Sequence, residues 1–365
     1  MKIAFYSPLK SPNHPVPSGD RLMARLLIRA LQLGGHEVEV VSELRSFQRE
    51  PVGEGQDSLK LAAEREREGI AAAWQRDGTP DVWFCYHPYY KARDLLGPSL
   101  CQSFGVTYVT AEASYSPKRN GMGWETIQAE LLADLRLAAV NICFTERDRQ
   151  GLLNAEPLLQ SALLPPFIDT ALFEKTASSP IRYRMATVAM MRAGDKLSSY
   201  RALSQALQLL PEDCPWSLDI VGDGPERETV RGLFDSVDHE RIIWHGEQTP
   251  ENIATILSRA SLYVWPGHGE AYGLAYLEAQ AAGLPVVAEK VAGVPAVVTS
   301  GKTGLLTEAG NTEAYADALL LLMKDESLRL EMAARARHFA IAERSLGSAS
   351  AALDAIIKSL PGETS

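Results

Sequence analysis

The sequence lacks the features typical of membrane-spanning and nucleic-acid-binding proteins. No apolar run approaches the ~18 residues needed to cross a bilayer, and Met1–Tyr6 reads as a short strand followed by prolines, not as a leader peptide. The formal net charge is −10, with 36 Lys and Arg against 46 Asp and Glu. Proteins that follow a nucleic-acid backbone carry clustered basic residues, so we expect no nucleic-acid partner.

Cysteine is scarce, and its spacing predicts neither a disulfide framework nor a zinc site. The four cysteines, Cys85, Cys101, Cys143 and Cys214, form no CxxC pair. Cys85 and Cys143 lie in apolar, strand-like runs, where a thiol behaves as a small hydrophobic group. A reduced, cytoplasmic location is the simplest interpretation.

A dinucleotide-binding fingerprint is also absent. The first strand-to-helix turn, Ser7 to Arg21, is long, rich in proline and without GxGxxG. An NAD-dependent enzyme is therefore not expected.

What the chain does contain is enough apolar sequence for two packed domains. It has 365 residues, 46% hydrophobic and 22% charged, which suits two domains of roughly 150–180 residues. Pro165-Pro166 and the polar stretch Lys175–Pro180 mark a hinge. We predict one domain over 1–167 and a second over 168–344, with a final amphipathic helix at about 345–360.

Both halves alternate short apolar runs with amphipathic stretches, which predicts parallel sheets built from βαβ units. In the first half the expected strands are Lys2–Ser7, Glu37–Ser42, Asp81–Tyr86, Thr107–Thr110 and Val140–Phe144, with helices at Arg21–Leu33 and Ser58–Gln75. In the second half they are Arg184–Met191, Ser217–Val221, Ile242–His245, Leu262–Trp265 and Pro285–Ala288, with helices at Leu197–Leu209, Glu226–Phe234, Thr249–Ser258, Gly273–Ala282, Thr312–Lys324 and Ser327–Ile341.

The most informative segment runs from Gly267 to Val287 and reads as a glycine-rich loop, a helix and a strand. Unpaired backbone N–H groups and the helix dipole at a helix start favour an anion such as a diphosphate. We expect a diphosphate to bind at the end of the loop and the start of the helix. The residues there are Ala271, Tyr272, Gly273, Leu274 and Ala275.

Two glutamates bracket this helix start. Glu278 lies one turn beyond Leu274 and shares its face, so its carboxylate could accept both hydroxyls of a ribose. Glu270 lies in the loop, where it could hold sugar hydroxyls on the far side of the phosphates. Together they suggest a nucleotide-sugar site.

This segment resembles the donor motif of retaining glycosyltransferases of family 4, in which two glutamates are separated by seven residues. Further stretches resemble that family in the same order along nearly the whole chain: Ser18-Gly19-Asp20, Gly34–Val38, Pro165–Asp169 as the interdomain strand, Ile220–Pro225 and Val291–Leu306. Each match is weak alone, but six in order are specific.

The resemblance implies a GT-B fold: two Rossmann-like, doubly wound α/β domains with an interdomain cleft and a C-terminal helix that crosses back to the first domain. It implies an acceptor-binding first domain, a donor-binding second domain and transfer with retention of anomeric configuration. The family uses no Asp-x-Asp metal motif, and none occurs here, so no metal or other cofactor is expected.

The resemblance also suggests site residues outside the segment. Arg192 and Lys196 stand where the family's diphosphate-binding Arg and Lys lie, and cations there can stabilise a departing diphosphate. Gly222 and Gly224 match a mid-domain turn, and Gly19 matches a loop glycine whose backbone approaches the leaving phosphate. In the first domain, Glu112 stands near the family's usual histidine, and His87 follows another strand. We expect both as catalytic candidates.

The prediction is therefore a retaining transferase that moves a sugar from a UDP- or GDP-sugar to an acceptor hydroxyl of a glycan, a lipid-linked molecule or a small molecule. Two alternatives stay open: a nucleotide-sugar epimerase or hydrolase on the same fold, and a non-catalytic nucleotide-sugar-binding protein. His268 and His14 read as loop residues without a catalytic part.

Several cations in the first half are open to more than one interpretation. Arg21, Arg25 and Arg29 share one helix face, which could make weak peripheral contact with an anionic membrane, although a solvated face is the favoured interpretation. Cations in first-domain loops, namely Lys91, Arg93, Lys118 and Arg119, hint at an anionic acceptor; the alternative is that these charges only keep the loops soluble.

Overall fold

The computed structural model describes residues 1–16, 18–53 and 55–360. The chain divides into two compact units, unit 1 with Met1–Pro165 and Leu346–Ser365, and unit 2 with Pro166–Ser345. The division falls between the paired prolines, whereas the sequence places it after Phe167. Among the residues described, no helix is both long and apolar enough to cross a membrane.

Unit 1 is built on a six-stranded parallel sheet with the order β2-β1-β3-β4-β5-β6. Its central strands are buried on both faces, as expected of a parallel sheet covered by helices. The strands are β1 (Lys2–Tyr6), β2 (Glu37–Val40), β3 (Val82–Tyr86), β4 (Thr107–Ala111), β5 (Val140–Cys143) and β6 (Ser161–Leu163). The helices are α1 (Gly19–Leu33), α2 (Gln56–Asp77), α3 (Gly97–Phe104), α4 (Glu125–Leu137), α5 (Glu146–Ala155) and α13 (Leu346–Lys358), with a 3-10 turn η1 (Pro117–Met122).

Local sequence explains how α1 is bounded. Ser18 caps its start by accepting a hydrogen bond from the Arg21 N–H, as a serine N-cap does. Gly35 follows its end with φ +85°, a conformation that glycine adopts without strain. The predicted helix over Arg21–Leu33 is confirmed.

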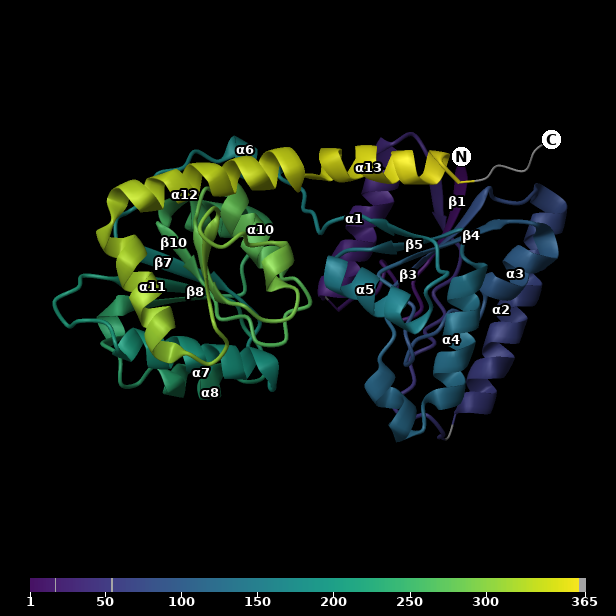
Figure 1. Ribbon diagram of the computed structural model, residues 1–365, viewed down its shortest axis with the longest axis horizontal. Coiled ribbons are helices and arrows are strands. Elements are labelled where there is room, and N and C mark those ends of the chain that lie inside the picture. Colours follow the sequence, from purple (N-terminus) through teal and green to yellow (C-terminus); the bar gives the residue numbers. More distant parts are fainter. Residues whose placement is uncertain (17, 54, 361–365) are drawn as a thin grey trace. The chain divides into compact units, whose positions relative to one another are not determined.

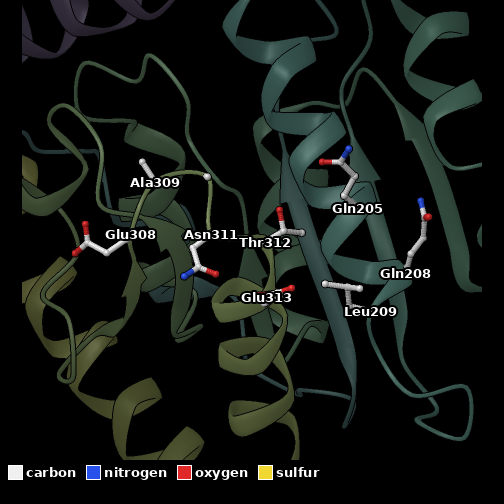
Figure 2. A pocket seen from close by; sticks show the side chains of 9 residues that line it. Gln205, Gln208, Leu209, Glu308, Ala309, Asn311, Thr312 and Glu313 are labelled. Atoms are coloured by element: carbon white, nitrogen blue, oxygen red, sulfur yellow. The ribbon is translucent and has the colours of Figure 1, made fainter.

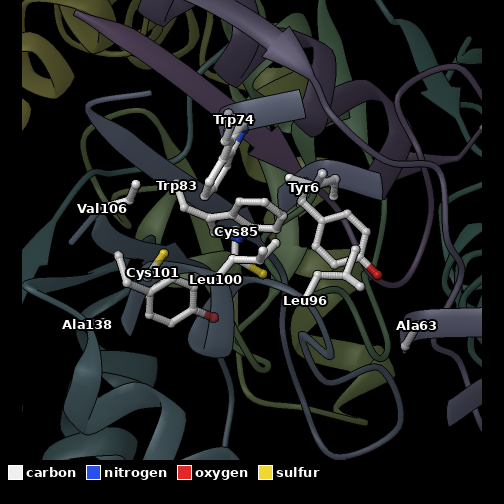
Figure 3. Packing of buried hydrophobic residues seen from close by; sticks show 13 residues of the cluster. Tyr6, Ala63, Trp74, Trp83, Cys85, Leu96, Leu100, Cys101, Val106 and Ala138 are labelled. Carbon is white, nitrogen blue, oxygen red and sulfur yellow. The ribbon is translucent and has the colours of Figure 1, made fainter. Parts of the chain in front are cut away.

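The core of unit 1 contains an apolar cluster (Figure 3), and the buried carboxylate of Asp94 accepts hydrogen bonds from two of its members. Trp83 lies between Tyr6 and Trp74, with ring centroids 5.8 and 6.1 Å away. The Trp83 Nε1–H donates to Asp94 at 2.9 Å, and the Tyr108 hydroxyl donates to it at 3.2 Å. Asp94 thereby provides the acceptor for the polar groups of two aromatic residues buried in the core. The sequence did not reveal this role.

The C-terminal helix belongs to unit 1, as predicted. Helix α13 packs along α1 (Figure 1), where the Ser350 hydroxyl donates to the Ala30 carbonyl at 2.8 Å. His36 Nε2 lies 3.1 Å from Asp354 Oδ1. These contacts join the two ends of the chain.

Unit 2 repeats the architecture with the sheet order β12-β11-β10-β7-β8-β9, again all parallel. Helices α10 and α12 cover one face of this sheet, and α7 and α8 cover the other (Figure 1). The strands are β7 (Arg184–Val188), β8 (Ser217–Val221), β9 (Ile242–Gly246), β10 (Leu262–Val264), β11 (Val286–Glu289) and β12 (Gly304–Thr307). The helices are α6 (Ala171–Lys175), α7 (Asp195–Gln208), α8 (Arg227–Leu233), α9 (Pro250–Arg259), α10 (Leu274–Ala281), α11 (Thr312–Lys324) and α12 (Glu326–His338), followed by a π-helical turn η4 (Phe339–Glu343).

Two sequence expectations about strands are wrong. Residues 165–169, compared above with an interdomain strand, contribute only an isolated bridge between Ile168 and Ser345, because β6 precedes the prolines, which cannot donate to a ladder. Strand β7 ends at Val188, before the predicted Met191, so Arg192 lies in a loop instead of at a strand end.

Candidate functional site

The glycine loop, residues 267–273, connects β10 to α10 in unit 2. Three of its residues, Gly267, Gly269 and Gly273, have φ of +87°, +65° and +77°, so the loop needs glycine at these places. Gly273 is the N-cap of α10, and no side chain caps this helix end. The first N–H groups of α10 therefore have no intrahelical acceptor and are available to an anion.

Glu270 in this loop is paired with Lys196 in the first turn of α7. Its Oε1 forms an ion pair with the Lys196 ammonium and also accepts a hydrogen bond from Trp265 Nε1 at 3.1 Å. The lysine Nζ lies 5.6 Å from the centroid of the Trp265 ring, in range for a cation–π contact. Two of the predicted catalytic residues thus meet, and Trp265, which the sequence did not single out, holds both.

Glu278 lies on α10 one turn after the uncapped start. Burial raises the pKa of its carboxyl from 4.5 to about 7. Within residues 1–16, 18–53 and 55–360, no donor to this carboxylate is found, so it can accept hydroxyl groups of a ligand.

The other unit 2 residues that were predicted to contact the donor differ in how exposed they are. In the loop and helix start, Ala271 is exposed, Tyr272 is buried, and Leu274 and Ala275 are partly exposed. Arg192 is exposed in the loop after β7, and its guanidinium has no carboxylate partner among the described residues. All of these side chains except that of the buried Tyr272 are accessible to a ligand.

Gly222 and Gly224 serve a second purpose, which is packing. A Cβ at either position would collide with the carbonyl oxygen of Ala189 or Met191, and both have strongly positive φ. Gly293 is similar, since a Cβ there would collide with the Ala271 carbonyl oxygen in the glycine loop. Sequence reasoning missed Gly293, although it lies in the stretch that matched the family.

His268 lies in the glycine loop, as expected, and has structural partners that the sequence did not reveal. Its Nδ1 lies 2.6 Å from Ser198 Oγ, and its Nε2 lies 3.1 Å from the buried carboxylate of Glu289. Its backbone N–H donates to Ser199 Oγ at 2.9 Å. His268 therefore fixes the glycine loop to α7 on one side and to the end of β11 on the other.

Unit 1 brings its own candidates together at the carboxyl ends of β3 and β4. His87 and Glu112 follow these strands directly with φ of +61° and +56°, rare for residues other than glycine and often found at functional sites. His87 Nδ1 lies 3.1 Å from Asp20 Oδ1, and the Tyr86 hydroxyl donates to Glu112 at 2.7 Å. Asp20 was not among the predicted residues.

The charges of this group are coupled. Burial would lower the pKa of His87, but the carboxylates of Glu112 and Asp20 outweigh it and hold this pKa above its usual value. Burial would raise the pKa of Asp20, yet its hydrogen bond to His87 and the charge of that residue bring it below the usual range. Burial raises the pKa of Glu112. The group is therefore a His87–Asp20 ion pair beside a carboxyl that holds its proton more tightly than usual.

Gly19 lies nearby in sequence, as the first residue of α1. A Cβ added there would meet no atom within 4 Å, so nothing in unit 1 requires glycine at this position. The space beside its backbone is open to a ligand.

Some first-domain cations have structural partners that the sequence did not reveal. On α1, Arg21 donates to the carbonyls of His14 and Pro15, and Arg25 donates to that of Pro12. This helix face therefore supports the loop after β1 and is not simply solvated. Arg93 pairs with Glu130 and Asp134.

One surface hollow of about 900 Å³ lies elsewhere in unit 2, between α7 and the start of α11 (Figure 2). Its polar lining includes Gln205, Gln208, Glu308 and Asn311 and none of the predicted site residues. We assign no function to it. Within the part of the chain that the structure describes, no group of three or more His, Cys, Asp or Glu side chains is placed to hold a metal ion.

Comparison with known proteins supports the family resemblance. Residues 178–339 match the family model for glycosyl transferases group 1. Over 143 residues, 39% of this chain, the sequence is 36% identical to N-acetyl-alpha-D-glucosaminyl L-malate synthase of Bacillus anthracis, and the match spans 37% of that relative's length.

Two solved structures share the fold over nearly their whole length. Sucrose-phosphate synthase from Thermosynechococcus elongatus is 20% identical with a TM-score of 0.75, covering 98% of each chain. HepE of Anabaena, solved in complex with UDP, is 16% identical with a TM-score of 0.74, covering 99% of this chain and 100% of that one. The protein therefore has the two-domain GT-B fold, and its residues 178–339 match the glycosyl transferases group 1 family.

Proposed function

We propose that this protein is a retaining glycosyltransferase that moves a sugar from a nucleoside-diphospho-sugar to an acceptor hydroxyl. The observation that carries the proposal is the uncapped N-terminus of α10 with one glutamate on either side, Glu270 before it and Glu278 one turn after it. A helix start binds the diphosphate, Glu278 accepts the ribose hydroxyls and Glu270 accepts those of the sugar.

The ion pair between Lys196 and Glu270 fits this assignment. Each side chain neutralises the other beside Trp265. A bound donor offers phosphate oxygens to Lys196 and hydroxyl donors to Glu270, so both charges keep partners when the pair opens. Arg192, exposed and without a carboxylate partner among the described residues, is the second cation for the diphosphate.

The nucleotide is a UDP or GDP group. HepE, which shares the fold, has been solved with UDP, and this favours a uridine donor as the first to be tested. The proposal needs no metal ion, because Arg192, Lys196 and the α10 dipole supply positive charge to the departing diphosphate.

The chemistry we propose is a front-face substitution. The acceptor oxygen bonds to the anomeric carbon on the face that the diphosphate leaves, the bond from that carbon to the phosphate oxygen breaks, and the acceptor proton moves to the leaving phosphate. In unit 1, His87 and Glu112 contact the reacting sugar or the acceptor, and Gly19 leaves room for the phosphate. The four cysteines, all buried and free, suit a reducing, cytoplasmic setting.

A thermal-shift screen with UDP- and GDP-sugars is the first test, because a ligand that binds only the folded state raises the melting temperature with concentration. The donor found in this way is then incubated with acceptor mixtures, with and without EDTA, and the anomeric configuration of the product is read by NMR. An inverted product, or a need for added metal, would overturn the mechanism. Donor consumption without any acceptor would instead indicate a hydrolase or an epimerase.

Glu270→Gln is the matched variant for the sugar contact. It keeps the size of the side chain and removes the charge that pairs with Lys196. We expect the variant to bind the free nucleoside diphosphate at least as tightly as the wild type, because Lys196 no longer has to leave a carboxylate partner, and to lose most turnover. Unchanged turnover would refute the role given to Glu270.

A further inference from the structure

A chain of aromatic rings in unit 1 leads away from His87. The His87 ring stacks on Tyr89 with centroids 5.3 Å apart, Tyr89 meets Tyr90 edge-on at 5.4 Å, and Tyr90 meets Trp124 edge-on at 4.9 Å. We call these four rings the aromatic ladder. It joins a catalytic candidate to a half-exposed surface at Tyr89 and Tyr90, while Trp124 is buried beneath.

The segment that carries the ladder is held in place by its backbone. Tyr89 and Ala92 exchange hydrogen bonds of 3.2 and 2.9 Å, and the Ser114 N–H donates to the Pro88 carbonyl at 3.2 Å. Because these hydrogen bonds already order the segment, it loses little conformational entropy when a ligand binds. The ladder is therefore a preformed surface.

Two cations flank the outer part of this surface. Lys91 Nζ lies 5.9 Å and Arg119 Cζ 5.5 Å from the centroid of the Tyr90 ring. Neither cation has a carboxylate partner among residues 1–16, 18–53 and 55–360. Arg93, two positions after Lys91, differs because it is paired with both Glu130 and Asp134.

Lys91 and Arg119 differ from Arg93 because a ring face, and no carboxylate among the described residues, contacts their charged groups. Ring faces attract such cations and orient them, and oriented cations that lack a counter-ion suit an anionic ligand. The rings also offer flat apolar faces on which the C–H side of a sugar can pack.

We propose that Tyr89, Tyr90, Lys91 and Arg119 form the acceptor subsite, and that the acceptor is a hydroxylated molecule carrying a carboxylate or phosphate. The anionic group lies between Lys91 and Arg119, and the hydroxyl that receives the sugar points along the ladder toward His87. Two ring contacts separate His87 from Tyr90, a separation that one or two sugar residues span. This inference rests on the proposed function.

A hollow of about 530 Å³ borders the same surface and gives a longer acceptor room to continue. Its lining includes Arg45, Phe47, Gln48 and Arg49, and the backbone N–H of Gln48 donates to the Lys91 carbonyl at 2.7 Å. Arg45 and Arg49 outnumber the one carboxylate in this lining, Glu50, so the lining carries a net positive charge.

The test is titration of the full chain with three probes, methyl glucuronide, glucose 6-phosphate and neutral methyl glucoside, followed by saturation-transfer NMR and tryptophan fluorescence. We expect at least one acidic probe to bind about tenfold more tightly than the neutral one, a difference of ~1.4 kcal/mol. Whichever acidic probe binds identifies carboxylate or phosphate as the recognised group. Equal binding of all three probes, or binding of none, would overturn the inference.

Matched variants locate the binding. The double variant Lys91→Ala/Arg119→Ala should weaken binding of the acidic probe about tenfold or more. Lys118→Ala removes an exposed lysine that makes no cation–π contact among the described residues, and it should leave this binding unchanged. Tyr90→Phe should retain binding and Tyr90→Leu should lose it. An equal effect of Lys118→Ala would show that only general charge matters and would refute the subsite. If Tyr90→Leu fails to fold, the variants at the partly exposed Lys91 and Arg119 still test the subsite.

Thermal-shift measurements with the nucleotide-sugar separate this inference from the proposed function. A donor that stabilises the wild type and all of these variants equally, with no acidic probe bound, would refute the subsite alone. Absence of any donor effect on the wild type would refute the proposed function, whatever the ladder binds.

Discussion

The raised pKa of Glu278 predicts that donor affinity depends on pH near neutrality. Burial raises this pKa from 4.5 to about 7, so near pH 7 about half of the molecules carry a protonated Glu278. Only the carboxylate form can accept two ribose hydroxyls. Binding therefore requires loss of the proton, and lowering the pH from about 8 to about 6 should weaken donor affinity about tenfold, or ~1.4 kcal/mol.

The assay is calorimetric titration of a nucleotide-sugar at several pH values. A nucleotide-sugar is preferable to a free nucleoside diphosphate, because its diphosphate is esterified at both ends and its charge does not change in this range. Glu278→Gln is the matched variant: it should bind donor weakly and with little pH dependence. A wild-type affinity that is the same at both ends of the range would refute the assignment of Glu278 to the ribose.

The same raised pKa also predicts an effect on stability. The ionised form of Glu278, which favours donor binding, destabilises the folded protein. Because the folded-state pKa lies above the unfolded value, the native protein binds the Glu278 proton more tightly than the unfolded chain does. This contribution to stability is present below pH 4.5 and is lost as the pH rises through about 7. Glu278→Gln should therefore stabilise the protein at pH 8 by an amount on the order of 2–3 kcal/mol while weakening donor binding, as thermal unfolding with and without donor will show.

Three further substitutions test the surroundings of the site. Gly293→Ala should lower the free energy of unfolding by about 1–3 kcal/mol and weaken donor binding, because its Cβ collides with the glycine-loop backbone. Gly151 has open space around it, so Gly151→Ala is the control. Urea unfolding should show no loss of stability for this control. Gly19→Ala should keep stability within about 0.5 kcal/mol but reduce turnover if the leaving phosphate approaches its backbone, and full activity would refute that contact. His268→Ala leaves the buried Glu289 carboxylate without its histidine partner and should lower both the melting temperature and donor affinity; an unchanged affinity would limit His268 to a structural role.

The fold was predictable where apolar periodicity is strong. Strand β8 and helix α11 were predicted to the residue, since each is a clear apolar run or amphipathic stretch bounded by turn residues. Strand β6 was missed because it is three residues long and only partly covered. Helix α4 was missed because its buried face includes Gln128 and Asp134, polar side chains that interrupt the apolar spacing and find partners only in the folded chain.

The candidate site was predictable as a motif but not as a set of contacts. The glycine loop and its two glutamates are contiguous in sequence, so local geometry suggested their roles. The ion pair between Lys196 and Glu270 joins residues 74 positions apart, and the link from His268 to Glu289 spans 21 positions. Partners of this kind depend on how α7 and β11 pack around the loop, which no local pattern encodes.

The contacts of Glu270 show how the charge of this loop carboxylate is compensated within unit 2. A loop carboxylate beside the buried Trp265 ring loses hydration, and an unpaired charge in such a place is costly. Lys196 offsets that cost and the Trp265 N–H satisfies a lone pair. A donor that replaced only one partner would leave the other charge uncompensated, whereas a nucleotide-sugar supplies phosphate for the lysine and hydroxyls for the glutamate at once. The pair therefore favours a ligand that carries both groups over a free sugar or a free nucleotide, and this selectivity precedes any contact with an acceptor.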